Sequence, residues 1–553
     1  MAARYIGHMP HNWASAECVH YLCDMLGSRT VNLFGCWRVS ASRNSPRTSR
    51  SRLPDRPLAS DGFRCVWSRS GGSADGGSTS NGNRDLLRPP SSCRPDLRQS
   101  IPRRTRGAQP GRCSHRAHVA LSRVINRLLS QSSVSSRDRL RTALEHREPD
   151  RIPLDFGSTN VTGIHVTCVA ALREYYGLPP GPVMVYEPFQ MLGSIDDDLR
   201  AAMGLDVTGV FPPKTKFGAP AADWKEWNFR GLDVLVPGDF RTTVSANGDI
   251  LVYPQGDLTA APSGRMPVGS AFFDIIVRQP EIDEDRLDPE DNLEEFGPLS
   301  EEDLGHIERS ARVAAASGCG VVGSFGGTSF GDVGQVPAAG LKNPKGIRDV
   351  AEWYISTRTR RAYIHRVFER QCEIAIANLA RIHSRIGDAL DSIYVCGTDF
   401  GTQTSAFCSV ATFRDLWFPY YQRVNHWVHG NTNWKCFKHS CGSVERFLES
   451  FIEAGFDIVN PVQCSAVGMD PAELKRKYGS RLVFWGGGVD TQKTLPFGSP
   501  QEVRTEVLRR LEIFAPGGGF VFNAIHNLQA GSPVENIVAL LDAVHDFYGV
   551  SHV

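Results

Sequence analysis

The chain has 553 residues, of which 41% are hydrophobic and 22% are charged, and its formal net charge is +1. This composition is typical of a globular protein with a sizeable core, and the near-neutral balance gives no argument for a nucleic-acid or membrane partner. Without an apolar run of about 18 residues or a secretory signal, we expect a cytoplasmic protein with a small-molecule substrate, whose 14 cysteines are reduced thiols or metal ligands.

Residues 1–133 form the first predicted unit and differ in composition from the rest of the chain. They contain Arg repeatedly but no Lys, with Ser- and Gly-rich stretches and little apolar periodicity. Such a segment cannot bury enough apolar surface to offset its ordering entropy, so we predict disorder. Three origins stay open: a basic interaction tail, an acid-poor organelle presequence, or upstream DNA translated from a start codon placed too early. The third is favoured, and no function is assigned to the six cysteines of this segment.

The second predicted unit, residues 134–553, begins with a helix capped by Ser136 and then alternates strands and helices. The region from 345 to 387 favours one long helix, with a break allowed for. Apolar runs that favour strands lie near 151–157, 206–212, 320–326, 392–399, 436–441, 457–463, 482–486 and 520–526.

Eight apolar strands alternating with amphipathic helices predict an α/β fold, a closed eight-stranded β/α (TIM) barrel. One insertion interrupts the pattern. Within residues 222–260, the runs LDVLVP and DILVYP lie on either side of the turn SANGD. This arrangement predicts a β-hairpin laid over the barrel mouth.

Reacting groups in such barrels lie at the carboxyl ends of the strands, so the residues that follow each predicted strand are the candidates for chemistry. They are Asp155, Asp399, Gln403, His439, Cys441, Gln463, Cys464, Asp490, Gln492, His526 and Asn527.

Three of these candidates predict a zinc site. His439 and Cys441 are two residues apart at the end of one strand, so their side chains point to the same face. His526 ends the last strand, and a barrel brings it to the same mouth. Zinc takes nitrogen and thiolate ligands, and a catalytic zinc needs about three of them plus an open position.

The neighbouring candidates have supporting roles or simpler explanations. Asp399, Gln403 or Gln463 could accept hydrogen bonds from the imidazoles, and Cys464 is a reserve ligand. On the simpler interpretation, Cys464 is a buried small hydrophobe, and Asp399 and Asp490 cap the helices that follow them. A lone His or Cys at a strand end is also more often a core residue than a ligand.

Several motifs in the chain resemble the uroporphyrinogen decarboxylase superfamily, over residues 135–550. The similar stretches are RDRLRTALEHREPDRIP near the start, DFGTQ at 399–403, NPVQ at 460–463, WGGGVDTQ at 485–492 and NAIHNLQAGSPVENI at 523–537. The superfamily includes the decarboxylases and the zinc-dependent methyltransferases that move a methyl group between a corrinoid protein and a thiol.

Departures from the family patterns separate the two branches. Decarboxylases of this superfamily carry an Arg-rich RQAGR motif after the first strand and an Asp after the second, where this chain has GSTNVTG at 157–163 and FPPK at 211–214. A substrate with several carboxylates needs guanidinium partners. The methyltransferases have the His-x-Cys pattern of His439 and Cys441 but usually supply a cysteine where this chain has His526.

The resemblance therefore implies a zinc-dependent methyltransferase that acts on a thiol with a corrinoid-type methyl donor, and a corrinoid protein as a possible partner. His439, Cys441 and His526 would be the metal ligands, and Asp399, Gln403 and His526 the catalytic group. Two alternatives stay open: a porphyrinogen decarboxylase that uses His526 without metal, and a barrel that binds a corrinoid without turnover.

Overall fold

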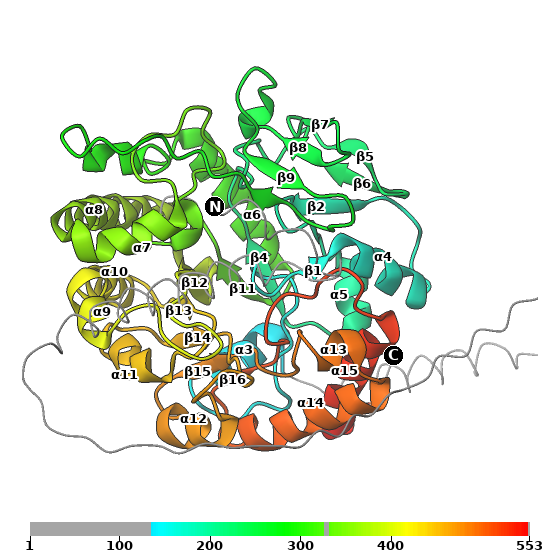
Figure 1. The fold of residues 1–553 in the computed structure, drawn as a ribbon. Coiled ribbons are helices and arrows are strands. Elements are labelled where there is room, and N and C mark those ends of the chain that lie inside the picture. Colours follow the sequence, from blue (N-terminus) through cyan, green and yellow to red (C-terminus); the bar gives the residue numbers. More distant parts are fainter. Residues whose placement is uncertain (1–133, 326–330, 551–553) are drawn as a thin grey trace, which may run out of the picture. The chain divides into compact units, whose positions relative to one another are not determined.

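The computed structural model describes residues 134–325 and 331–550. The predicted disordered segment, residues 1–133, lies outside the described residues. Three β-sheets and their flanking helices make up the described chain, a mixed α/β fold (Figure 1).

The largest sheet contains seven parallel strands in the order β16-β15-β14-β13-β12-β11-β4. Each lies where an apolar run predicts a strand. The strands are β4 (Val207–Val210), β11 (Gly320–Gly323), β12 (Ser392–Cys396), β13 (Lys435–His439), β14 (Ile458–Asn460), β15 (Val483–Trp485) and β16 (Phe520–Val521).

The sheet curls so that one segment reaches both of its edges. At the β16 edge, the backbone N–H of Phe522 donates to Pro153 O at 2.9 Å, and that of Asp155 donates to Phe522 O at 3.0 Å. At the β4 edge, the backbone N–H of Asp206 donates to Leu154 O at 2.9 Å. The run predicted as the first strand, 151–157, thus contributes an isolated bridge between Leu154 and Phe522 in place of a strand.

Helices follow most of the strands, and Figure 1 shows α8, α10, α11, α12 and α14 around the outside of the curled sheet. The α-helices are α3 (Ser136–Leu144), α4 (Val166–Tyr175), α5 (Asp197–Met203), α6 (Glu301–Ala316), α7 (Val350–Thr359), α8 (Arg361–Ile386), α9 (Val410–Leu416), α10 (Phe418–Asn431), α11 (Glu445–Glu453), α12 (Pro471–Tyr478), α13 (Thr494–Phe497), α14 (Pro500–Phe514) and α15 (Val534–Phe547). Short 3-10 turns are η1 (Pro254–Gly256), η2 (Pro289–Leu293), η3 (Val333–Gln335) and η4 (Gly387–Ala389).

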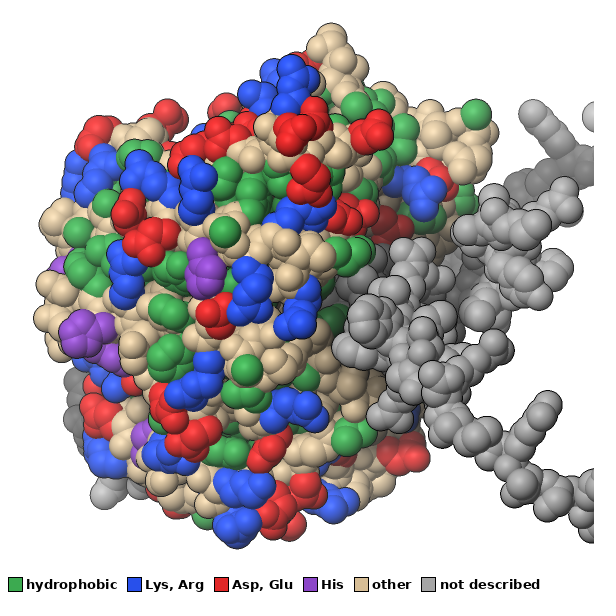
Figure 2. Space-filling model, turned by 60° about the vertical axis from the view of Figure 1, so that its left-hand side comes forward, with side chains coloured by type: hydrophobic (Ala, Val, Ile, Leu, Met, Phe, Trp, Pro, Cys, Tyr) green, Lys and Arg blue, Asp and Glu red, His purple; other side chains and the backbone are tan. Residues whose placement is uncertain are grey.

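The outer surface carries charges of both signs. On the face drawn in Figure 2, Lys and Arg side chains lie interspersed with Asp and Glu. Within the described ranges, none of the helices combines the length and the apolar composition that crossing a membrane requires.

Apolar side chains fill the interior of the curled sheet. They form one buried cluster, to which the strands contribute Val207, Val322, Phe437, Ile458, Val483, Trp485 and Val521. Helix α3 adds Leu140 and Leu144 to this cluster. The helix is held there by ion pairs, because Arg137 contacts Asp391 at 3.0 Å and Arg139 contacts Asp206 at 2.6 Å. Both aspartates directly precede strands, so α3 covers the amino end of the sheet.

Two smaller sheets lie in the first half of the described chain. One has the order β1-β3-β2-β6-β5 and the other β10-β9-β8-β7. Their strands are β1 (Ile164–His165), β2 (Val183–Glu187), β3 (Leu192–Gly193), β5 (Lys225–Phe229), β6 (Leu232–Val236), β7 (Thr242–Val244), β8 (Ile250–Val252), β9 (Gly264–Met266) and β10 (Asp274–Ile275).

The strand pairing predicted for the insertion is wrong. Strand β6 pairs with β5, and β8 pairs with β7, so the runs LDVLVP and DILVYP belong to two different hairpins. The cause is a two-residue turn at Arg230 and Gly231, whose φ angles are 53° and 93°. Two successive residues with positive φ form the tight turn that folds one strand back on the other.

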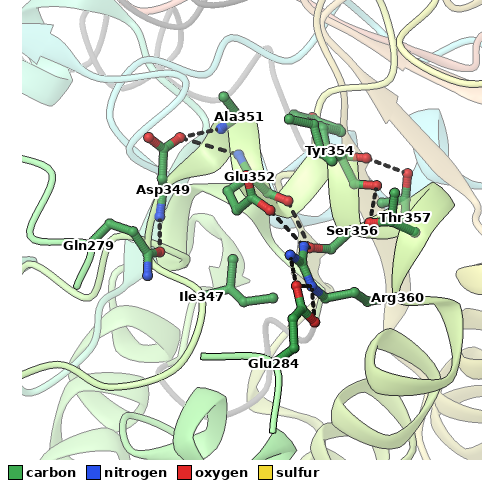
Figure 3. A network of polar contacts seen from close by, with 12 residues as sticks. Gln279, Glu284, Ile347, Asp349, Ala351, Glu352, Tyr354, Ser356, Thr357 and Arg360 are labelled. Atoms are coloured by element: carbon green, nitrogen blue, oxygen red, sulfur yellow. Dashed lines mark hydrogen bonds and ion pairs between the residues drawn. The ribbon is translucent and has the colours of Figure 1, made fainter. Parts of the chain in front are cut away.

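The long helix predicted at 345–387 is broken into α7 and α8 at Arg360, whose backbone is not helical. Figure 3 shows the contacts around this break: the Arg360 guanidinium binds the carboxylates of Glu284 and Glu352, the latter at 2.6 Å. At the start of α7, Asp349 caps the helix, and its own N–H donates to Gln279 Oε1 at 3.0 Å. Polar contacts thus hold α7 at both ends.

Candidate metal centre

Three side chains from two distant parts of the chain converge at the carboxyl end of the curled sheet. His439 is the last residue of β13, Cys441 follows two residues later, and His526 follows β16. Cys441 Sγ lies 3.4 Å from His439 Nε2, and the two imidazole centroids are 5.5 Å apart. One potential ligand atom from each residue lies within 4.8 Å of the other two.

The imidazole of His439 is held by Asn460. Its Nδ1 lies 2.6 Å from Asn460 Oδ1, while Asn460 Nδ2 donates to Trp485 O at 2.8 Å. The Trp485 carbonyl can only accept, so it fixes the amide orientation and directs Oδ1 toward the imidazole. The His439 Nδ1 therefore carries the proton, and the lone pair of Nε2 points toward Cys441.

His526 is held in the same manner by its neighbour. Its Nδ1 lies 2.8 Å from Asn527 Oδ1, and Asn527 Nδ2 donates to Asn160 O at 3.1 Å and to Gln190 Oε1 at 2.7 Å. These acceptors again fix the orientation of the amide, so the proton of His526 lies on Nδ1. In both imidazoles Nε2 is therefore the ring nitrogen that would bind a metal.

Burial keeps His439 neutral. The side chain is buried, and loss of hydration lowers its pKa to about 4, although the hydrogen bond to Asn460 acts in the opposite direction. A neutral imidazole is the form that binds metal ions. At neutral pH the Nε2 lone pair is therefore not blocked by a proton.

Asp399 positions Cys441. Its Oδ1 accepts from the backbone N–H of Cys441 at 2.6 Å and lies 3.8 Å from His439 Nε2. The residue is buried and bonds a strand end, so it does not act as the helix cap that the simpler interpretation predicts.

Helix α7 supports Asp399 from its backbone side. The hydroxyl of Tyr354 donates to Asp399 O at 2.9 Å, and the Tyr354 ring stacks on Phe407 with centroids 4.9 Å apart. Tyr354 was not among the sequence candidates, because it lies in a helix that comes beside the segment after β12 only once the chain has folded.

The two glutamines named with Asp399 contact other groups than the imidazoles. Gln463 Oε1 accepts from Gly442 N–H at 2.7 Å, and Gln403 Nε2 donates to Gln492 Oε1 at 3.3 Å. A cavity lies beside the three donors, and Gln463, Gln492, Cys441 and His526 help to line it. Both glutamines therefore belong to the walls near the cluster.

Cys464 and Asp490 are also near the cluster but do not join it. The Cys464 thiol donates to Val462 O at 3.4 Å, and burial raises its pKa to about 12. Asp490 lines the cavity, and its Oδ1 accepts from the backbone N–H groups of Gln492 and Lys493. Asp490 thus caps the turn before α13 and not the helix itself, which the simpler interpretation predicts.

A second group of potential ligands lies at the opposite end of β13. His429 Nε2 is 2.8 Å from Asp457 Oδ2, and the Lys435 ammonium is 3.6 Å from Asp457 Oδ1. Burial raises the pKa of the third member, Cys436, well above its ordinary range. A carboxylate already paired with an ammonium, beside a thiol that resists ionisation, suits a divalent cation poorly.

The first cluster, in contrast, has the chemistry of a zinc site. One thiol and two imidazoles are zinc ligands, and the 3.4 Å between Cys441 Sγ and His439 Nε2 falls in the range of about 3 to 4 Å that tetrahedral coordination requires. Hydrogen bonds from Nδ1 to a fixed acceptor are the usual support of metal-binding imidazoles. His439, Cys441 and His526 therefore fit a zinc ion.

The fold and this cluster define an α/β protein with a candidate metal centre at the carboxyl end of a curled parallel sheet. Residues 344–547 match the family model described as uroporphyrinogen decarboxylase (URO-D). The resemblance seen in the sequence is thereby confirmed over residues 344–547.

Curated relatives support the same family over a shorter stretch. The chain is 28% identical over 106 residues to a uroporphyrinogen decarboxylase from Coxiella burnetii, which is 18% of this chain and 26% of the relative. It is 33% identical over 112 residues to that of Psychromonas ingrahamii, 20% of this chain and 28% of the relative. The matched stretch thus spans about a quarter of these relatives.

Among solved structures, a methyltransferase from Methanosarcina mazei aligns with a TM-score of 0.46 and 16% identity, over 75% of this chain and 100% of its own.

Proposed function

We propose that this chain is a zinc-dependent methyltransferase of the uroporphyrinogen decarboxylase superfamily, which transfers a methyl group from a corrinoid-type donor to a thiol. The observation that carries the proposal is the convergence of three zinc-competent side chains, with both imidazoles oriented by amide oxygens. A corrinoid protein would be its partner. The eight cysteines of the described residues form no disulfide with one another, which suits a reducing compartment, so we include a cytoplasmic location in the proposal.

Each residue has a definite task in this proposal. His439, Cys441 and His526 would hold the zinc, and Asp399 keeps Cys441 in place through its backbone N–H. When bound, zinc lowers the pKa of a substrate thiol and makes the thiolate available at neutral pH. The thiol proton leaves to water. The sulfur then forms a bond to the methyl carbon, while the bond from that carbon to the donor breaks and leaves its electron pair on the donor.

The proposal also includes a closed barrel of eight strands. The segment around Leu154 would be the eighth strand, since it forms backbone hydrogen bonds with Phe522 on one side and Asp206 on the other. In a closed barrel all carboxyl strand ends surround one mouth, which accounts for the meeting of residues 439 and 526.

Metal content of the purified full chain tests the proposal. We expect about one zinc per chain, lost on Cys441→Ser and retained on Cys464→Ser, because only Cys441 belongs to the donor cluster. The Cys464 variant is the matched control, since it removes a nearby thiol without touching the cluster. A metal-free wild-type protein, or zinc loss in the control, would contradict the proposal. Bound zinc with no methyl transfer to any thiol would favour a binding barrel without turnover.

A second candidate function is decarboxylation of a porphyrinogen. The observation in its favour is that the curated relatives are described as uroporphyrinogen decarboxylases. Against it, the segment GSTNVTG at 157–163 contains no guanidinium to pair with carboxylates. This segment reaches the site because Asn160 O accepts from Asn527, the neighbour of His526. Incubation of the full chain with uroporphyrinogen tests this function, and conversion to coproporphyrinogen would establish it.

A further inference from the structure

The cavity beside the candidate metal ligands has a distinctive distribution of charge. It is a shallow cavity that opens to solvent, and Cys441 and His526 form part of its wall. The other side chains that line it are Gln463, Ser465, Asp490, Thr491, Gln492 and Ile525. Among the described residues, this lining contains one carboxylate and no Lys or Arg.

The carboxylate is held firmly and is only partly used by the protein. Asp490 is 8% exposed, and its Oδ1 accepts from the backbone N–H of Gln492 at 2.7 Å and of Lys493 at 3.0 Å. The other oxygen, Oδ2, forms no hydrogen bond within the described part of the chain. A buried carboxylate with an open acceptor oxygen attracts a hydrogen-bonding cation and repels an anion.

The opposite side of the site supplies no compensating cation. The segment GSTNVTG at 157–163 has no ionisable side chain, and it reaches the site where Asn160 O accepts from Asn527 next to His526. The ammonium of Lys216 is engaged elsewhere, since it donates to Gly334 O at 2.5 Å and lies 5.4 Å from the centre of the Phe189 ring. An anionic substrate would therefore meet only the negative charge of Asp490 along this cavity.

We propose that the methyl acceptor is a small thiol that carries an ammonium group, with Asp490 as the partner of that ammonium. This inference rests on the proposed function, because it assigns the acceptor of the same site. Thiols that carry a carboxylate are disfavoured, and neutral thiols of the same length are intermediate.

The test measures binding of three small thiols of similar length to the full chain loaded with Co²⁺ in place of zinc. They are 2-aminoethanethiol, 2-mercaptoethanol and mercaptoacetate, and binding is followed by the increase of the thiolate-to-cobalt absorption band above the contribution of Cys441. The free thiols differ in acidity, so their affinities are not compared with one another. Instead, the affinity of each thiol for the wild type is compared with its affinity for Asp490→Asn. Asparagine keeps an oxygen for the N–H groups of Gln492 and Lys493 but lacks the charge.

We expect Asp490→Asn to weaken binding of the aminothiol about tenfold, the size of effect typical of a partly buried charge pair, and to leave the neutral thiol within about twofold. Binding of mercaptoacetate should become stronger. Asp470→Asn is the control: Asp470 caps α12 and does not line the cavity, so all three affinities should stay unchanged.

The possible failures are distinguishable. If the three thiols give an absorption band but Asp490→Asn shifts their affinities equally, the inference about the acceptor is overturned and the proposed function stands. If none of them increases the band of the cobalt-loaded protein, the proposed function fails, and the inference falls with it. A band that persists in Cys441→Ser would overturn the assignment of the metal site itself.

Discussion

Two amide side chains determine how the imidazoles of the candidate centre are presented. Asn460 and Asn527 each accept from an Nδ1–H, and each is prevented from rotating because its own NH₂ group donates to a fixed acceptor. A carboxylate in either place would make the imidazole more basic. The neutral amides instead orient the rings without adding charge.

We expect Asn460→Ala and Asn527→Ala each to weaken zinc affinity by about 10- to 100-fold, the usual effect of removing a hydrogen-bond partner of a metal-binding histidine. Competition with a chromogenic chelator measures the affinity. Asn536→Ala is the matched control, because Asn536 is equally buried and donates to Leu495 O and Gly498 O, away from the centre. An equal loss of affinity in the control would show that the effect is a general loss of stability.

A second prediction at this scale concerns acid stability. His165 is buried between Thr167 and Ala271 O, and burial lowers its pKa to about 4. The unfolded state therefore binds a proton at a higher pH, near 6.5, than the folded state does. Stability is complete above pH 6.5 and is lost as the pH falls from 6.5 toward 4.

Urea unfolding at pH 7.5 and pH 4 checks this expectation. Between these values the wild type should lose up to about 3 kcal/mol more than His165→Asn, since each pKa unit corresponds to about 1.4 kcal/mol. His439 is present in both proteins, so its own titration cancels in the comparison. Equal losses in the two proteins would contradict the prediction.

The sequence predicted most of the candidate centre but not its support. The period of two along a strand placed His439 and Cys441 on one face, and the structure brings His526 beside them. Asn460 was missed, although it is the register partner of His439 on the neighbouring strand. The candidates were residues that follow strand ends, such as Gln463, whereas the imidazole contacts Asn460, the last residue within β14.

At the scale of elements, local sequence patterns located strands well and pairings poorly. The seven strands of the large sheet match apolar runs, because burial on both faces requires continuous apolar residues. The small strands β1 and β3 contain two residues each, too few for any period to be visible. The pairing of β5 with β6 depended on the turn at Arg230 and Gly231, which has no Asn-Gly or Asp-Gly signature.

Helix α7 gives a prediction about an element that touches no ligand. Tyr354 donates to the Asp399 carbonyl, and Asp399 in turn accepts from Cys441 N–H. Tyr354→Phe removes only the hydroxyl and keeps the ring stacked on Phe407. We expect zinc affinity to fall about threefold to tenfold, in line with the free energy of about 1 kcal/mol of one hydrogen bond.

The control for this variant is Tyr363→Phe, which removes a hydroxyl from α8 that bonds Asn292 Oδ1 at 2.6 Å. This change should lower the urea midpoint to a similar extent but leave zinc affinity unchanged. If Tyr354→Phe lowers only the urea midpoint of unfolding, the Tyr354 hydroxyl has a structural role alone, and α7 does not influence the metal ligands.

At the scale of the whole described molecule, stability depends on the buried charges that close the amino end of the sheet. Asp206 is fully buried and pairs with Arg139 and Arg151, both at 2.6 Å. Its Oδ2 also accepts from Leu154 N–H at 2.9 Å. One carboxylate thus joins α3, β4 and the segment that bridges the edges of the sheet.

We expect Asp206→Ala to lower the free energy of unfolding by about 3 to 5 kcal/mol, because it removes the buried carboxylate that two largely buried guanidinium groups share. Asp197→Ala is the comparison: its side chain is 92% exposed and pairs with Arg200 on the surface. That change should cost less than about 1 kcal/mol. Urea denaturation followed by circular dichroism measures both, and similar losses would contradict the assigned role of Asp206.

The apolar filling of the curled sheet has a consequence for how reactants reach the candidate centre. The side chains of the cluster, from Val207 to Val521, together with Leu140 of α3, are buried inside the curled sheet. The candidate ligands follow the carboxyl ends of the strands, beyond this packed interior. Under the proposed function, the methyl donor and its acceptor would both approach from that end, so an excess of either reactant should slow the reaction by excluding the other.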